Sequence, residues 1–494
     1  MTNAGAIIRL KSVLNRYRST VFLVGIAFFF ALSLSVLALA INTPCAQAAS
    51  KNLDEMMTGK VKSEQFASPQ GCTCHSELQN QWADSMHAQS LDDPFYKMQT
   101  AQVEQDAGKD VVKFCDTCHA PAAVMSGNMK NVEANDALNG ITCTVCHQVV
   151  AQTAKDPGNA SLAYPKGGPD GVLHAQIMDP KAAHQASGIK VYNSSEYCGA
   201  CHNVSHPANG LKLETTYDEW KESSFAKAGT TCQNCHMASN ASFKAPVEGQ
   251  AAMGAPTRKD IFSMTFVGAN VAQGNAELSS ALLKKAAKVE ISLPSDIVPA
   301  GQEEVATVRV TNTGAGHSIP TGLTEVRNMW LVINAVDAKG NKTEIGRTEF
   351  GTKLTDDKGK EVGAKFWLGA KKKSDVRIKA GETFTQEVKV AMPADAQQQT
   401  VVAELNYQSA KDEVIAPSKV KNPTTTMAKA SQGVYVSEEA KKAANTPKPA
   451  EKTTNQKSTD DNKGVIPAVI VSAIILVTVI VVLVIIRSRK QRMS

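Results

Sequence analysis

The chain has 494 residues, enough for two or three domains, and its 43% content of hydrophobic residues is ordinary for a globular protein. The net charge of +6 is concentrated at the two ends, where eight basic residues have no acidic neighbours and leave the rest of the chain slightly acidic. Because no basic surface remains for a polyanion, the sequence argues against nucleic acid as a partner.

The N-terminal residues 1–48 have the three parts of a secretory signal peptide. Basic residues precede an apolar run at 21–41, and Ala46-Gln47-Ala48 suits cleavage by signal peptidase. The apolar run is longer than usual, so an uncleaved membrane anchor is the alternative. Both interpretations predict export of the residues that follow, and cleavage would remove Cys45.

The ten remaining cysteines lie between residues 72 and 235, and eight of them form four C-x-x-C-H motifs. Covalent haem needs two thiols for its vinyl groups and an adjacent imidazole for its iron, whereas neither a disulfide framework nor a zinc site requires a histidine after every second cysteine. The sequence therefore predicts four haem c groups. The predicted thioether residues are Cys115, Cys118, Cys143, Cys146, Cys198, Cys201, Cys232 and Cys235, and the proximal iron ligands are His119, His147, His202 and His236.

One more motif, the first of five in chain order, is one residue short, because Cys72 and Cys74 enclose only Thr73 before His75. Two extended residues span at most about 7 Å, so both thiols reach one haem only if the backbone around Thr73 is stretched. The alternative is a single thioether from Cys74, with Cys72 left free. In either case His75 is placed to bind iron, and a fifth haem is expected.

Each haem iron has a second axial position. Five histidines do not follow a cysteine, and they are the predicted distal ligands: His87, His174, His184, His206 and His317. Ten histidines would supply two imidazoles to each of five haems. His206 lies one helical turn after His202 and so is expected to serve a neighbouring haem. An ordinary solvated or packed side chain is the alternative at each of the five positions.

The haem-binding segment contains a coarse internal repeat. The sequences QWADSMHA at 81–88 and EWKESSFA at 219–226 share the pattern W-x-x-S-x-[HF]-A, which aligns His87 with Phe225. The motifs GITCTVCH and GTTCQNCH likewise share Gly-x-Thr-Cys. Because Phe225 fills the equivalent position, packing alone does not require a histidine at 87, and this favours a ligand role for His87.

The pattern of apolar residues predicts several domains. Residues 49–275 are expected to form a multihaem domain rich in loops, in which the porphyrins provide much of the core. Residues 276–288 have the spacing of a connecting helix. From 289 to 410 apolar residues recur at every second position in short segments separated by turns, which predicts an all-β sandwich. Residues 411–464, rich in Lys, Thr, Pro and Ala, are expected to be a disordered tether.

The 22 uncharged residues 465–486 are long enough to span a bilayer as a helix, and the positive-inside rule places the basic tail 487–494 in the cytoplasm. The predicted fold class is therefore multidomain: a mainly α-helical and irregular multihaem cytochrome c domain, an all-β sandwich, a flexible linker and a C-terminal transmembrane helix. This predicts a single-pass protein of the cell membrane whose haems lie on the periplasmic or extracellular face.

Several motifs together resemble those of a known family. The run C-H-x6-W-x-x-S-x-H-A at 74–88, with CDTCHAP, GITCTVCH and TTYDEWKES leading to GTTCQNCHM, resembles the multihaem cytochrome c family typified by the tetrahaem electron-acceptor cytochrome of the hydroxylamine-oxidation pathway. The resemblance covers residues 66–240, and CTCH departs from it. GAGHSIPTG at 314–322 resembles a segment of the sandwich domain in some extracellular filament-forming cytochromes. It implies that His317 is an axial ligand, for a haem of its own chain or of a neighbouring subunit.

Two functions are compatible with these motifs. Haems with imidazole on both faces have no site for a substrate, which predicts an electron carrier rather than a catalyst. The expected partners are redox proteins with basic surfaces, including a membrane quinone oxidoreductase, and further copies of the chain that share haem ligation between subunits. The alternative is an oxidoreductase of a small nitrogen or sulfur compound, which needs one haem with an open axial position.

Overall fold

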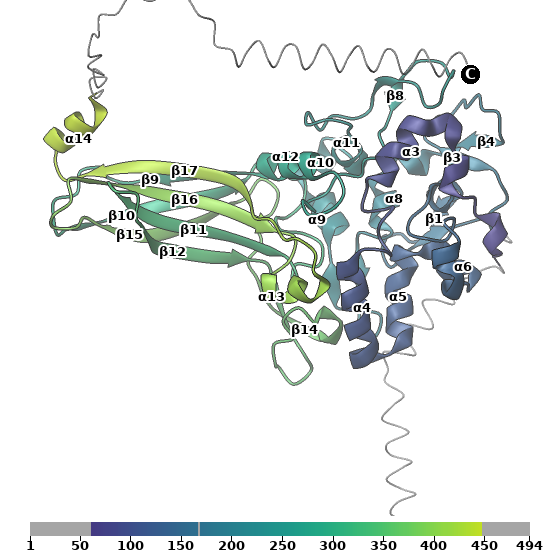
Figure 1. Ribbon diagram of the computed structural model, residues 1–494, viewed down its shortest axis with the longest axis horizontal. Coiled ribbons are helices and arrows are strands. Elements are labelled where there is room, and N and C mark those ends of the chain that lie inside the picture. The colour runs from purple at the N-terminus through teal and green to yellow at the C-terminus, as the bar shows by residue number, and fades with distance from the viewer. Residues whose placement is uncertain (1–60, 166–167, 447–494) are drawn as a thin grey trace, which may run out of the picture. The chain divides into compact units, whose positions relative to one another are not determined.

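Short helices and turns make up the region that carries the attachment motifs (Figure 1). The computed structural model describes residues 61–165 and 168–446. The α-helices of this region are α3 (Ser76–Ala83), α4 (Pro94–Ala107), α5 (Lys109–His119), α6 (Pro121–Ser126), α7 (Cys143–His147), α8 (Ser195–Gly199), α9 (Thr216–Glu222), α10 (Ser224–Lys227) and α11 (Cys232–His236). The 3-10 helices are η1 (Ser63–Gln65), η2 (Pro69–Gly71), η3 (Thr73–His75), η4 (Met129–Ala134) and η5 (Lys190–Asn193).

Four two-stranded pairs connect these helices. They are β1 (Ala151–Gln152) with β2 (Leu162–Ala163), β3 (Leu173–Ala175) with β4 (Ala186–Gly188), β5 (Val204–Ser205) with β6 (Lys212–Glu214), and β7 (Val247–Gly249) with β8 (Arg258–Ile261). The largest apolar cluster among the described residues of this region has nine buried members, four of them alanines. Such a core is small for a region of this length. This is in keeping with the prediction that porphyrins provide much of the burial.

The attachment motifs coincide with helix ends. Two of them form a complete short helix, α7 and α11, and a third forms the last turn of α5. Helix α5 stops at His119 because Ala120 is extended ahead of Pro121, which begins α6. The chain therefore turns directly after the proximal histidine, and this fixes the direction in which the imidazole leaves the backbone.

Helix α12 (Ala276–Ala286) leads from the motif region into the β-rich region. Asn275 caps its first turn by accepting a hydrogen bond from the backbone N–H of Leu278 at 3.0 Å. The helix ends two residues earlier than the predicted 276–288, since Ala287 is already extended and begins strand β9.

The predicted all-β region consists of two main antiparallel sheets. One has the strand order β15-β10-β9 and the other β12-β11-β16-β17, and a separate pair joins β13 and β14. The strands are β9 (Ala287–Ser292), β10 (Glu303–Asn312), β11 (Asn328–Asp337), β12 (Lys342–Phe350), β13 (Thr352–Thr355), β14 (Lys371–Asp375), β15 (Thr383–Ala391), β16 (Gln398–Gln408) and β17 (Thr425–Tyr435). The short helices of this region are η6 (Phe366–Leu368), α13 (Asp412–Ile415), η7 (Ala416–Ser418) and α14 (Glu438–Asn445).

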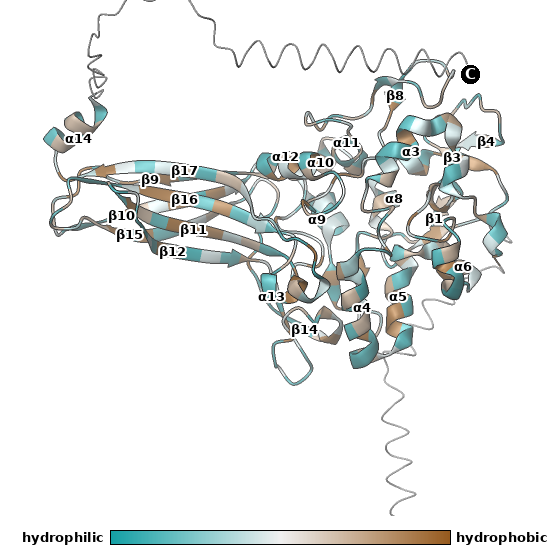
Figure 2. Cartoon of the chain, viewed as in Figure 1, coloured by the Kyte–Doolittle hydropathy of each residue, from teal (hydrophilic) through white to brown (hydrophobic). Residues whose placement is uncertain are grey.

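The two sheets share one apolar core. Val308 of β10, Leu331 of β11 and Leu405 of β16 are fully buried members of the same cluster of 22 residues. Polar and apolar residues alternate along the strands (Figure 2), as expected when one face of each sheet meets the core and the other meets water. The period-two pattern in the sequence therefore has its predicted structural basis.

The prediction of a disordered tether over 411–464 is wrong for its described part, 411–446. Strand β17 pairs with β16 from Gln398 opposite Tyr435 to Tyr407 opposite Thr425, so the sandwich extends past residue 410. The composition of β17 resembles that of a linker because only a few of its side chains are apolar. Two of these, Met427 and Val434, are buried, and the backbone ladder with β16 supplies the remaining stabilisation.

The predicted signal peptide at 1–48, the predicted span at 465–486 and the tail at 487–494 lie outside the described residues. Among the described residues, no helix has the length and apolar character needed to cross a membrane.

Leu405→Ala is expected to lower the free energy of unfolding by about 2–5 kcal/mol, since it leaves a cavity between the two sheets. Leu368→Ala serves as the control because Leu368 is 39% exposed, and its expected loss is about 0.5 kcal/mol or less. Chemical denaturation followed by far-ultraviolet circular dichroism measures both values. Equal losses would contradict the assignment of Leu405 to the core.

Candidate haem sites

The ten motif cysteines carry free thiols and form no disulfide in the part of the chain that the structure describes. Over the same residues, no group of three or more His, Cys, Asp or Glu side chains is gathered as a metal-ion site requires.

Each motif histidine has its Nδ1 atom within hydrogen-bond distance of an oxygen. The partners are Ala251 O for His75 at 2.7 Å, Ser90 O for His119 at 2.9 Å, His174 O for His147 at 2.7 Å, Glu214 Oε1 for His202 at 3.2 Å and Val267 O for His236 at 2.6 Å. With Nδ1–H as the donor, the ring orientation is fixed and Nε2 is left for a metal. Sequence reasoning missed these partners, because four of the five are backbone carbonyls that any residue can supply.

Three motif histidines each face a second imidazole. An iron–imidazole bond of about 2.0–2.1 Å, taken from other metal–histidine sites, puts the centres of two rings on opposite faces of one haem roughly 6.3 Å apart. The observed ring-centre distances are 6.3 Å for His75 and His184, 6.3 Å for His87 and His202, and 6.2 Å for His236 and His317. The spacing in each pair matches that expected for two axial ligands of one iron.

The electrostatics of the His87 and His236 rings suit iron binding, whereas the pKa of His202, which burial alone would lower, is raised to about 9 by the Glu214 carboxylate. Burial lowers the pKa of His87 to about 3 and that of His236 to about 4. Both imidazoles are therefore neutral at ordinary pH, which is the form that coordinates a metal. The Nδ1 atoms of His87 and His174 are also buried without a hydrogen-bond partner in the described chain. A buried imidazole nitrogen is costly unless something binds it, so both residues fit a ligand role.

His206 has a different role from the predicted one. Its Nε2 atom bonds the backbone oxygen of Trp367 at 3.0 Å, and its Nδ1 atom accepts from the backbone N–H of Ala208 at 3.2 Å. Trp367 is itself buried with Val103 of α4 and donates from its indole nitrogen to Asp106 at 3.1 Å. Both ring nitrogens of His206 are thus engaged in a contact that joins the β-rich region to the motif region, and not in an imidazole pair.

The histidines therefore do not suffice for two imidazoles on each of five haems. With His206 engaged elsewhere, nine remain for ten axial positions. Within residues 61–165 and 168–446, His119 and His147 have no second imidazole at the spacing of the three pairs. Each stacks on a tyrosine instead, Tyr96 at 3.9 Å and Tyr192 at 5.9 Å between ring centres. The backbone oxygen of His174 bonds the ring of His147. The ring of His174 is the remaining distal candidate that faces no other imidazole in the three pairs.

The short motif at residues 72–75 is turned rather than stretched. Thr73, Cys74 and His75 form the 3-10 helix η3, and the backbone N–H of His75 donates to the oxygen of Cys72 at 2.9 Å. The thiol of Cys72 contacts that of Cys143 in the third motif, and this hydrogen bond lowers the pKa of Cys72 to about 7. Both thiols reach one haem only if the backbone around Thr73 is stretched, so this turned backbone favours a single thioether from Cys74.

Cysteines of different motifs also approach each other elsewhere. Cys118 of the second motif is hydrogen-bonded to Cys201 of the fourth, and Cys198 of the fourth to Cys232 of the fifth. With the contact between the first and third motifs, these pairs connect neighbouring attachment points through the fold. Haems attached at such points would lie close together.

The internal repeat is visible in the hydrogen bonds. Trp82 donates from its indole nitrogen to Ile141 O at 2.8 Å, and Trp220 donates to Thr230 O at 2.8 Å. Each acceptor lies two residues before the first cysteine of a Gly-x-Thr-Cys motif. The repeated segment therefore positions the same kind of attachment helix twice. In the first copy it also carries His87, and in the second it carries Phe225.

Comparisons with known proteins agree with this site. Residues 71–148 match the family model described as "Cytochrome c554 and c-prime". The fold is similar to that of a penta-haem cytochrome c552 from Thermochromatium tepidum, with a TM-score of 0.54, 20% sequence identity and coverage of 76% of this chain and 99% of that one. The CARDB domain of a Pyrococcus furiosus protein matches 30% of this chain and 85% of its own, at 14% identity and a TM-score of 0.17. A search of curated proteins finds no match.

The attachment motifs and the family match together support a multihaem c-type cytochrome, and its cofactor is haem c. The resemblance to the hydroxylamine-pathway cytochrome and to the filament-forming cytochromes stays a prediction from the sequence motifs.

His87→Ala is expected to convert one low-spin ferric haem to high spin, because it removes one of two axial imidazoles. His206→Ala is the matched control and should leave the spin states unchanged while lowering the melting temperature. Electron paramagnetic resonance of the oxidised holoprotein measures the first effect, and calorimetry the second. A high-spin signal in His206→Ala would restore His206 as a ligand.

Cys74→Ala is expected to reduce the number of covalently bound haems by one, whereas Cys72→Ala should leave it unchanged. The reason is that the backbone around Thr73 is turned, whereas both thiols would reach one haem only along a stretched backbone. Intact-protein mass spectrometry counts the haem increments in both variants. Loss of a haem in Cys72→Ala would show that both thiols are attached.

Proposed function

We propose that this protein is an exported multihaem c-type cytochrome with five haems, which passes electrons from one haem to the next. The observation that carries the proposal is the set of three imidazole pairs at 6.2–6.3 Å. Two strong nitrogen ligands on one iron leave no position for a substrate and suit electron transfer. Cofactor binding and electron transfer are also supported at the family level.

The contacts between motif cysteines support a connected path for electrons. They join the first motif to the third, the second to the fourth and the fourth to the fifth. Tyr197 of the fourth motif's helix α8 donates to the backbone oxygen of Cys146 at 2.8 Å, which links the third motif to the fourth. Through these contacts all five attachment points would belong to one chain of haems.

The chain's own residues would also set differences in reduction potential. Four motif histidines donate to neutral backbone carbonyls, whereas His202 lies 3.2 Å from the carboxylate of Glu214. A carboxylate partner makes an imidazole a stronger donor to iron and stabilises the ferric state. The haem at His202 is therefore proposed to have a lower potential than its counterparts with carbonyl partners.

The proposed location is the outer face of the cell membrane. The support is the apolar run at 21–41 and the uncharged run at 465–486, followed by a basic tail. A membrane quinone oxidoreductase would then supply or accept electrons, and extracytoplasmic redox proteins would be the other partners. His317 pairs with a histidine of its own chain, so a haem chain extended by further copies would need contact between haems rather than a ligand shared through His317.

A second candidate is supported by the histidine count. Nine histidines cannot fill ten axial positions, so one of five haems would lack a second imidazole. Such a haem could bind and reduce or oxidise a small nitrogen or sulfur compound. An enzyme of this kind would convert its substrate repeatedly, whereas an electron carrier would not.

When reduced with dithionite and mixed with an oxidised c-type cytochrome under anaerobic conditions, the protein is expected to donate one electron per haem and then stop. When nitrite or hydroxylamine replaces the oxidised cytochrome, the electrons that the compound accepts should not exceed one per haem. Stopped-flow absorbance and product assays measure both reactions. Sustained consumption of either compound while a reductant is supplied would favour the enzyme.

A further inference from the structure

The third imidazole pair differs from the other two in its origin. His236 ends α11 in the motif region, whereas His317 lies between β10 and β11 of the sandwich. The pairs of His75 with His184 and of His87 with His202 lie entirely within the motif region. We call the haem of the motif at 232–236, the fifth in chain order, the fifth haem. Of the three imidazole pairs, the pair at this haem is the one that depends on how the sandwich is attached to the motif region.

The backbone of the His317 loop is fixed to the sandwich. Ile319 and Ile378 exchange two backbone hydrogen bonds, at 2.9 and 3.0 Å. The side-chain amide of Asn312 donates to His317 O at 2.8 Å and to Ile378 O at 3.0 Å. The loop thus moves with the sandwich, and these bonds alone would not hold His317 against a haem.

The loop also passes tightly against the motif region. A Cβ atom at Gly314 would lie 2.0 Å from the backbone oxygen of Lys285, so only glycine fits there. A Cβ atom at Gly316 would lie 3.2 Å from the ring of Phe225. Phe225 occupies the position that His87 has in the first copy of the repeat. In one copy this position supplies a ligand, and in the other it supports the loop that supplies one.

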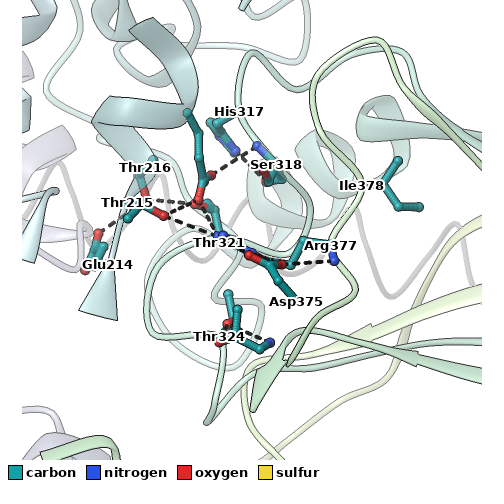
Figure 3. Close-up of polar contacts among 12 residues, drawn as sticks. Glu214, Thr215, Thr216, His317, Ser318, Thr321, Thr324, Asp375, Arg377 and Ile378 are labelled. Atoms are coloured by element: carbon teal, nitrogen blue, oxygen red, sulfur yellow. Dashed lines mark hydrogen bonds and ion pairs between the residues drawn. The ribbon is translucent and has the colours of Figure 1, made fainter. Parts of the chain in front are cut away.

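Glu219 of α9 binds the loop from the motif side. Its Oε2 atom accepts from the backbone N–H of Ser318 at 3.1 Å and from the hydroxyl of Thr321 at 2.8 Å. Its Oε1 atom accepts from Thr215 at 2.6 Å and from Arg377. Figure 3 shows Ser318, Thr321, Thr215 and Arg377 around this network, with His317 beside it.

Arg377 neutralises the buried carboxylate. The side chains of Arg377 and Glu219 are only 9% and 10% exposed, and Arg377 also forms two bonds of 2.8 Å to Asp375. Burial of a charge is costly unless the charge is paired and hydrogen-bonded, so removing Arg377 would leave the buried carboxylate of Glu219 without its charged partner. The network therefore favours the arrangement in which α9 and the His317 loop are together.

We propose that Glu219, paired with Arg377, is a positioning residue that holds His317 at the fifth haem, so that the coordination of this haem depends on the docked sandwich. The inference rests on the proposed ligation of that haem by His236 and His317. Glu219 does not touch the iron. It acts on the backbone N–H of the residue next to the ligand.

Glu219→Gln in the holoprotein is the main test. Glutamine has the same size but replaces one acceptor oxygen by a donor, which opposes the donors of Ser318, Thr321 or Arg377. The expected result is a high-spin ferric signal that exceeds that of the wild type by up to one haem per protein. Carbon monoxide binding after reduction should increase by the same number of haems. Glu303→Gln is the matched control, because Glu303 pairs with Lys389 at the exposed surface of the sandwich.

Three further variants separate the possible failures. His317→Ala should give the full increase of one high-spin haem, which added imidazole reverses. If it gives none, the proposed ligation by His317 is wrong. If His317→Ala gives the increase and Glu219→Gln does not, the positioning role is wrong while the ligation stands. Should Glu219→Gln fail to fold, Thr321→Val removes the hydroxyl that donates to Glu219 and contacts Thr216, and Arg377→Lys keeps the charge. Wild-type spin states in both would overturn the proposal.

Discussion

Axial coordination by two imidazoles is, in the proposed function, the interaction on which the rest of this protein would depend. Each pair joins residues that are distant in the sequence, and at 6.2–6.3 Å between ring centres the two rings would share one iron. The motif region has only a small apolar core of its own. Coordination would therefore connect its short helices in the way that packed side chains connect the sheets of the sandwich.

The sandwich contributes to the haem sites as well as to stability. Its polar contacts with the motif region include one between Trp367 and His206 and one between Arg377 and Glu219. The first contact uses a histidine that would otherwise be available for iron. The second lies beside the loop that carries His317. Both contacts place charged or polar groups in a buried environment, where unpaired groups are costly, so they favour one arrangement over others.

The number of free imidazoles also bears on function. With a free His206, every haem could carry two histidines, which favours electron transfer. Its engagement with Trp367 leaves one axial position without an imidazole, at the second or third motif. The stacking of Tyr96 on His119 and of Tyr192 on His147 orients these proximal rings whatever occupies the opposite face.

The sequence by itself determined the attachment chemistry, because C-x-x-C-H is a local pattern whose spacing is set by one helical turn. It also predicted the repeat and most strands of the sandwich, since periodicity reflects burial of one face. Only the tertiary structure decided which imidazoles face each other, that His206 bonds Trp367, and that β17 belongs to the sandwich. These outcomes depend on contacts between distant residues: a carbonyl of Trp367, a carboxylate of Glu219 and the edge of β16, none of which leaves a local pattern in the sequence.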